Sequence, residues 1–218
     1  MSAPDTPIIT GDDTLGVILP TKARRNALTE ALFESGQWLE VIPGAEGLTV
    51  QFDPLLISPE AAQNALKQAL SAPVIPQAIQ ADRLVIPVCY DPEYALDATH
   101  ISACTGLSLQ DIVARHTGTI HTVDMLGFTP GFAYIEGCGP DLNVPRLDTP
   151  HTYLPAGAVG LAGGLSGVYA LPGPGGWPII GRTPITLFDT TRSDPFRLGP
   201  GQTIAFEAIS KADFEAWQ

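Results

Sequence analysis

The stretch GLAGGLSGVYALPGPGGWPIIGRTP, from Gly160 to Pro184, decides the fold. It contains one charged residue, Arg182, and its glycines and prolines are incompatible with a continuous helix. About half of the chain's 22 glycines and 21 prolines lie between Gly127 and Pro184, together with several aromatic residues. Because the stretch lacks the Ser, Gln and Lys bias of disordered segments, it predicts closely spaced short strands with tight turns, as in a β-barrel or sandwich.

The sequence before residue 81 has a different character. TPIITGDDTLGVIL predicts strands on either side of a turn, and WLEVIPGAEGLTVQFD predicts two strands joined at Pro43-Gly44. KARRNALTEALFESG and SPEAAQNALKQAL have helical periodicity, the second with Ser58 as N-cap. The order resembles a ferredoxin-like unit whose last strand falls within VIPQAIQ, residues 74–80. We therefore predict an α+β protein with a ferredoxin-like α/β domain at residues 1–80 and a β-barrel domain at residues 81–218.

The barrel domain is predicted to begin with the strand RLVIPVCYD and a helix in LSLQDIVARHTG that starts at Ser108. HTVDMLGFTPGFAYI predicts strand, turn and strand. TPITLFD, residues 183–189, and QTIAFEAI predict late strands, and KADFEAWQ a terminal helical turn.

The composition and charge of the chain argue against several classes of binding partner. The formal charge of −12 disfavours nucleic acid and anionic lipid surfaces. The N-terminus lacks the features of a signal peptide, and no window reaches the length of a membrane span, so we expect a cytoplasmic protein. The cysteines have neither disulfide nor zinc spacing, and no metal is expected; they are Cys89, Cys104 and Cys138.

Two arginines, Arg146 and Arg182, are the only Lys or Arg residues between Arg115 and Arg192. The planar guanidinium suits carboxylate or phosphate, whereas pairing with Asp148 or Asp189 would make either arginine structural. Neighbouring glycines either cradle phosphates or simply form turns; they are Gly163, Gly164, Gly175 and Gly176. Aromatic side chains offer flat surfaces for a cleft, and the candidates are Phe128, Phe132, Tyr134, Tyr169 and Trp177.

Histidine chemistry is open to two interpretations at His116, which closes a predicted helix. It is either a helix-end cation or a proton-transfer group, and we take it as the candidate catalytic residue. His121 and His151 lack metal-type spacing. GLSGV resembles a nucleophile elbow around Ser166, but no helix follows it, so that interpretation is rejected.

Several motifs together resemble the allophanate hydrolase subunit 1 family, which includes the B subunit of 5-oxoprolinase and the Kip-type kinase inhibitor. They are GFTPGFAYIEG, VPRLDTPHTYLPAGAVGLAGG and YALPGPGGWPIIGRTP followed by LFD, supported by VIPGAEGLTVQFD, IPVCYD and VARHTG. The resemblance spans nearly the whole chain. It implies a ferredoxin-like domain followed by a cyclophilin-like β-barrel. Departures from the family pattern occur at His151, Ala158, Leu165, Ser166 and Ala170.

The resemblance also implies a function. It suggests the B subunit of an ATP-dependent 5-oxoprolinase, which acts with two further proteins: a homologous, cyclophilin-like larger subunit of the C type, and a separate hydrolase subunit of the A type. ATP, with magnesium, would be a substrate of the complex, and no tightly bound cofactor is expected. Two alternatives stay open: a histidine-kinase inhibitor, and a carboxyltransferase half-site that works with a biotin-dependent partner.

Overall fold

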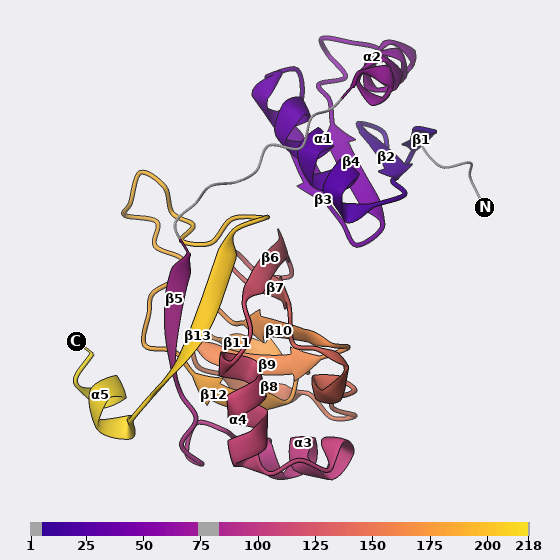
Figure 1. Ribbon diagram of the computed structural model, residues 1–218. Coiled ribbons are helices and arrows are strands. Elements are labelled where there is room, and N and C mark those ends of the chain that lie inside the picture. The colour runs from indigo at the N-terminus through magenta and orange to yellow at the C-terminus, as the bar shows by residue number, and fades with distance from the viewer. Residues whose placement is uncertain (1–5, 74–82, 218) are drawn as a thin grey trace. The chain divides into compact units, whose positions relative to one another are not determined.

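The computed structural model describes residues 6–73 and 83–217. The chain divides into two compact units, Met1–Ile79 and Gln80–Gln218, each with its own hydrophobic core. Figure 1 shows the elements of each unit in chain order.

The N-terminal unit is a four-stranded antiparallel sheet with two helices. Its strand order is β1-β2-β4-β3. Each helix begins at a side-chain cap, because the hydroxyl oxygens of Thr21 and Ser58 accept hydrogen bonds from Arg24 N and Ala61 N. The elements are β1 (Ile8–Ile9), β2 (Thr14–Ile18), α1 (Lys22–Glu34), β3 (Glu40–Pro43), β4 (Gly47–Gln51) and α2 (Pro59–Ser71).

The ferredoxin-like arrangement is matched only in part by this sheet. The segment β2-α1-β3-β4-α2 has the expected element order, and β4 lies between β2 and β3. The edge beside β2 is occupied by β1. The strand predicted within residues 74–80 lies outside the described residues, so the ferredoxin-like assignment stays a prediction.

The C-terminal unit is a closed β-barrel, as predicted. Its strands follow the order β10-β7-β6-β13-β5-β12-β9, and β9 pairs with β10 to close the ring. β5 and β13 are parallel, and the other barrel pairs are antiparallel. The barrel strands are β5 (Leu84–Cys89), β6 (His121–Leu126), β7 (Ala133–Glu136), β9 (Ala158–Ala162), β10 (Leu165–Val168), β12 (Ile179–Arg182) and β13 (Thr203–Ile209).

Smaller elements surround the barrel. The strands β8 (His151–Leu154) and β11 (Gly173–Gly175) form a separate antiparallel pair, which we call the β8–β11 ribbon. The helical elements are α3 (Ala98–Thr105), α4 (Leu109–Thr117), the 3-10 helix η1 (Pro140–Leu142) and α5 (Lys211–Glu215).

The strand predicted for residues 183–189 is wrong. In that segment only Phe188 forms a β-bridge, an isolated one with Phe196. Pro184 has no N–H to donate to a strand ladder, and the amide of Ile185 bonds instead to the hydroxyl of Thr183. A local turn therefore replaces the strand. The helix α3 was not predicted.

Candidate functional site

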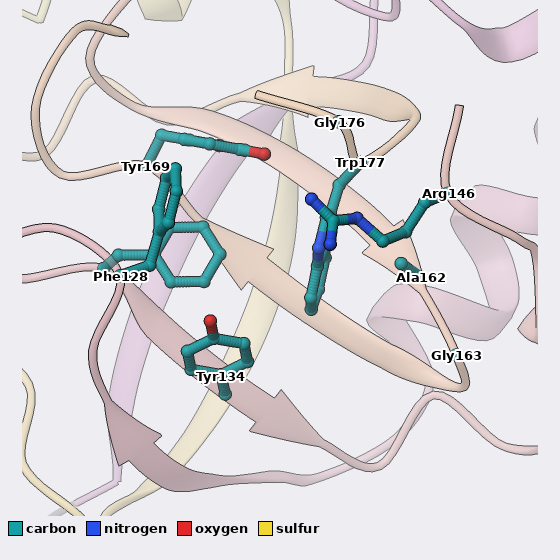
Figure 2. A pocket seen from close by; sticks show the side chains of 9 residues that line it. Phe128, Tyr134, Arg146, Ala162, Gly163, Tyr169, Gly176 and Trp177 are labelled. Atoms are coloured by element: carbon teal, nitrogen blue, oxygen red, sulfur yellow. The ribbon is translucent and has the colours of Figure 1, made fainter. Parts of the chain in front are cut away.

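A pocket of about 300 Å³ lies on the outer face of the barrel, over β7, β9 and β10 (Figure 2). Its lining joins the GFTPGF turn, the segment before β8 and the glycine-rich segment before β12. The lining residues are Phe128, Phe132, Tyr134, Arg146, Ala162, Gly163, Tyr169, Gly176 and Trp177. The structure thus brings the five predicted aromatic residues together with one predicted arginine and two predicted glycines.

Strand alternation explains how the floor of the pocket forms. In β7, Ala133 and Ile135 point into the barrel core, so Tyr134 between them lies on the outer face. Its partner in β10 is Gly167. A Cβ on Gly167 would lie 2.8 Å from the Phe132 ring and 2.9 Å from the Trp177 ring. Only glycine at this position lets the two aromatic rings pack against the sheet.

The aromatic walls of the pocket are organised around Phe132, which is buried. Its ring packs edge-on against three others. The ring centres lie 4.9 Å from those of Tyr134 and Tyr169 and 5.7 Å from that of Trp177. Edge-to-face contacts of this kind stabilise a fixed arrangement of rings. The ring centres of Phe128 and Phe132 lie 5.5 Å apart, but Phe128 is 61% exposed. The backbone of Phe128 is in the left-handed region, with φ of 67°. The turn therefore holds one phenyl ring outward at the rim of the pocket.

Backbone hydrogen bonds to two glycines, Gly163 and Gly176, fix the chain on either side of Arg146. Its neighbour Val144 accepts a hydrogen bond from Gly163 N at 2.9 Å, and Leu147 N donates to Gly176 O at 2.8 Å. A Cβ on Gly176 would lie 3.2 Å from Nη2 of Arg146, so glycine leaves room for the guanidinium. Within residues 6–73 and 83–217, Arg146 has no hydrogen bond or ion pair. Its charge is therefore available to a ligand.

Two phenol groups share the pocket with this guanidinium. Figure 2 shows the hydroxyls of Tyr134 and Tyr169 directed toward the same space as Arg146. Burial raises the pKa of Tyr169, an effect partly offset by a hydrogen bond from the Trp177 amide and by the charge of Arg146. Tyr169 is therefore a neutral hydroxyl at physiological pH.

The predicted glycines act as turns and spacers. Gly163 and Gly164 both have positive φ and form the two-residue connection between β9 and β10. The amide of Gly163 is already bonded to Val144, so it is not free for phosphate. Gly164 and Gly175 do not line the pocket; Gly175 pairs with His151 in the β8–β11 ribbon.

Arg182 lies in a different hollow of about 470 Å³. Its Nε donates to Ala156 O at 2.9 Å, and its guanidinium lies 5.6 Å from the centre of the Phe214 ring. The structure therefore does not bring Arg182 to the aromatic pocket. Among the described residues, neither Asp148 nor Asp189 forms an ion pair with Arg146 or Arg182.

His116 is fully buried in the barrel interior. Its Nδ1 lies 2.7 Å from the Tyr90 hydroxyl and its Nε2 lies 2.9 Å from the Ser166 hydroxyl, and its ring stacks on Phe206. Burial, reinforced by the nearby His121, holds the pKa of His116 well below its ordinary value. Ser166 and the pocket-facing Gly167 are consecutive residues of β10, on opposite faces of the sheet. His116 is thus separated from the pocket by the barrel wall.

One side-chain hydrogen bond near the pocket was not predicted from the sequence. Nε2 of His151 lies 2.8 Å from Oδ2 of Asp97, and this carboxylate oxygen also accepts a hydrogen bond from Ile179 N at 2.7 Å. The partners are 54 positions apart in the chain, and no local pattern marks such a pairing.

Neither a metal-ligand cluster nor a membrane-spanning helix occurs among residues 6–73 and 83–217. No cluster of three or more His, Cys, Asp or Glu side chains there is arranged to hold a metal ion. No helix in those residues is sufficiently long and apolar to span a bilayer. The three cysteines are unpaired, and burial raises the pKa of Cys138 to about 12, which makes that thiol unreactive.

The fold and the site define a closed β-barrel module that carries an aromatic pocket with one available guanidinium on its outer face. The chain belongs to the family described as carboxyltransferase domain, subdomain C and D, whose model matches residues 11–198. It is 33% identical over 196 residues to the 5-oxoprolinase B subunit of Bacillus subtilis, a match that covers 83% of this chain and 80% of the relative. It is 34% identical over 193 residues to the 5-oxoprolinase B subunit of Escherichia coli O157:H7, with 87% of each chain covered.

Solved structures show the same fold. The crystal structure of TTHA0988 matches with a TM-score of 0.78 and 32% identity over 90% of this chain, which corresponds to 40% of that longer chain. The conserved uncharacterized protein PH0987 from Pyrococcus horikoshii matches with a TM-score of 0.60 and 32% identity, over 95% of this chain and 99% of that one. The Kluyveromyces lactis urea carboxylase matches over 96% of this chain and 22% of its own, with a TM-score of 0.73 at 18% identity, which shows the fold alone.

Proposed function

We propose that this chain is the B subunit of an ATP-dependent 5-oxoprolinase and that its aromatic pocket binds 5-oxoproline. The names of the relatives at 33–35% identity support the reaction class. The observation that carries the assignment to the pocket is Arg146, whose guanidinium has no protein partner among the described residues and lies beside the aromatic walls.

The pocket suits the chemistry of 5-oxoproline. The substrate is a five-membered lactam ring with one carboxylate, so it needs a flat apolar surface and a cation. Phe132 and Trp177 supply the surface, and Arg146 can donate two parallel N–H hydrogen bonds to the carboxylate. The hydroxyls of Tyr134 and Tyr169 can donate to the lactam carbonyl. This arrangement binds and orients the ring.

The chemical step requires groups from other subunits. Opening the lactam is thermodynamically uphill, so ATP would phosphorylate the amide oxygen with release of ADP, and water would then open the phosphorylated ring to give glutamate and phosphate. Among the described lining residues of the pocket there is no carboxylate, histidine or lysine to transfer a proton. We therefore propose that these groups and the site for magnesium-bound ATP come from two partners, the homologous larger subunit of the complex and its separate hydrolase subunit. The use of ATP and the unpaired cysteines favour the cytoplasm.

The finer features of the fold belong to the same proposal. We assign the N-terminal unit to a ferredoxin-like arrangement from its β2-α1-β3-β4-α2 order. We assign the barrel to the cyclophilin-like class from the motifs of the glycine-rich stretch.

The test is reconstitution. The chain should co-purify with the larger subunit, and the complete complex should hydrolyse ATP only when 5-oxoproline is present. Arg146→Ala should raise the KM for 5-oxoproline by about tenfold or more, because it removes a charged hydrogen bond to the carboxylate. An unchanged KM in a folded Arg146→Ala complex would refute the placement of the substrate in this pocket.

A carboxyltransferase half-site is the second candidate, favoured by the description of the matching family. Transfer of carboxylate from carboxybiotin by the complex, without ATP-dependent turnover of 5-oxoproline, would support that function instead.

A further inference from the structure

We propose that Asp97 and His151 form a positioning pair that fixes the wall of the aromatic pocket. The segment involved is Gly175–Ile179, which runs from the β8–β11 ribbon to the start of β12. It contains Gly176 and Trp177, both of which line the pocket. The expected effect on the KM for 5-oxoproline rests on the proposed function, whereas the expected effect on the conformation of residues 175–179 does not.

The Asp97 carboxylate holds both ends of this segment. At one end Oδ2 accepts the hydrogen bond from Ile179 N at 2.7 Å, and Asp97 N donates to Ile179 O at 3.0 Å. At the other end the same oxygen lies 2.8 Å from His151, the strand partner of Gly175. One side chain thus closes a loop around five residues.

The position of Asp97 in the chain supports this role. It is the N-cap residue of α3, where an aspartate side chain commonly bonds to the helix amides. Here the side chain makes no capping bond and is directed to His151 and Ile179 instead. The side chains of Asp97 and His151 are only 13% and 28% exposed. Both side chains of the pair are thus largely shielded from solvent.

The ribbon needs such an attachment. Within the described ranges β8 and β11 pair with each other and not with the barrel, and their register is irregular between Gly173 and Gly175. The same segment also anchors Arg146, because Leu147 N donates to Gly176 O. Movement of the segment would therefore displace both Trp177 and the guanidinium that faces the ligand.

The first measurement is amide hydrogen exchange in the full chain without ligand. Asp97→Ala should accelerate exchange in residues 175–179 by about tenfold or more while β5 and β13 stay protected, because it removes the side-chain hydrogen bonds at both ends of the segment. His151→Ala should have a smaller effect, since it frees one end. His151→Arg, which keeps an N–H donor at this position, should restore protection.

The matched control is Glu93→Ala. Glu93 precedes Asp97 in the same connection after β5, and its carboxylate pairs with Lys211 instead. Exchange in residues 175–179 that is the same in Asp97→Ala as in Glu93→Ala would overturn the inference. If Asp97→Ala does not fold, the comparison of His151→Ala with His151→Arg decides: loss and rescue support the pair, and no difference overturns it.

The second measurement uses the reconstituted complex with 5-oxoproline. His151→Ala should raise the KM for 5-oxoproline about tenfold with kcat within about twofold of wild type, and His151→Arg should restore the KM. A loosened segment with unchanged KM would overturn the positioning role. If the wild-type complex does not turn over 5-oxoproline, the proposed function fails, whereas the exchange result still supports or overturns the pair.

Discussion

The burial of His116 predicts that the free energy of unfolding depends on pH. The size of this effect follows from the difference in protonation between the folded and unfolded chain. The folded chain keeps the ring neutral because burial and the neighbouring His121 hold its pKa well below the ordinary value of 6.5. The unfolded chain exposes the ring and binds a proton as the pH falls through 6.5. The unfolded state therefore binds more protons, and the folded state loses relative stability as the pH decreases.

The magnitude follows from the difference in protonation. Between pH 7.5 and 5.5, an unfolded histidine with a pKa of about 6.5 gains about 1.4 kcal/mol from proton binding that the folded His116 does not share. Urea denaturation of wild type and His116→Gln at both pH values measures this quantity. Glutamine does not titrate, so the loss of unfolding free energy on acidification should be about 1.4 kcal/mol smaller in the variant.

Two results would refute this reasoning. Equal pH dependence in wild type and His116→Gln would mean that His116 does not stay neutral in the folded protein. An NMR titration that shows the His116 ring protonating near its ordinary pKa of about 6.5 in the folded chain would mean the same. A loss of turnover in a stable His116→Gln complex would instead support the catalytic role predicted from the sequence.

The other predictions concern the pocket and its surroundings. Arg146→Lys should raise the KM for 5-oxoproline about ten- to a hundredfold in steady-state assays, since lysine cannot form the bidentate contact; an unchanged KM would contradict it. Gly175→Ala should destabilise the chain by about 1–3 kcal/mol in urea unfolding, because the new Cβ would lie 2.5 Å from the Tyr169 hydroxyl; wild-type stability would argue against that packing. Arg182→Lys should lower the melting temperature, through loss of the Nε hydrogen bond to Ala156, and leave the KM within about twofold. A KM raised tenfold with no change in melting temperature would instead support the ligand-binding role predicted for Arg182 from the sequence.

The sequence allowed much of the barrel and its pocket to be predicted. Glycine and proline density predicted tight turns, and GFTPGF forms one at the pocket, whereas GPGGW forms strand β11 and the start of the segment that follows it. Arg146 stood out because basic residues are so scarce in that half of the chain. These signals are local, and the structure places the corresponding side chains on one surface.

The positions of Arg182 and His116 depend on information that local patterns do not contain. The pairing of β12 with β9 is irregular between Ile179 and Gly181. A shift of one residue in a strand sends every later side chain to the opposite face. The face of the sheet on which Arg182 lies could therefore not be predicted from the sequence. His116 lies in the last turn of α4, and its burial depends on Phe206, which is far along the chain. The pairing of Asp97 with His151 is likewise a tertiary contact.

The parallel contact between β5 and β13 has a consequence for synthesis on the ribosome. These two strands begin and end the barrel, and they pair from Leu84–Ile204 through Cys89–Ile209 (Figure 1). The ring that carries the pocket cannot close until residue 209 has left the exit tunnel. Until then β5 presents an unpaired edge that includes the apolar residues Ile86 and Val88, which makes the nascent chain prone to aggregation. A nascent chain that ends before β13 therefore exposes the edge of β5 to intermolecular strand pairing.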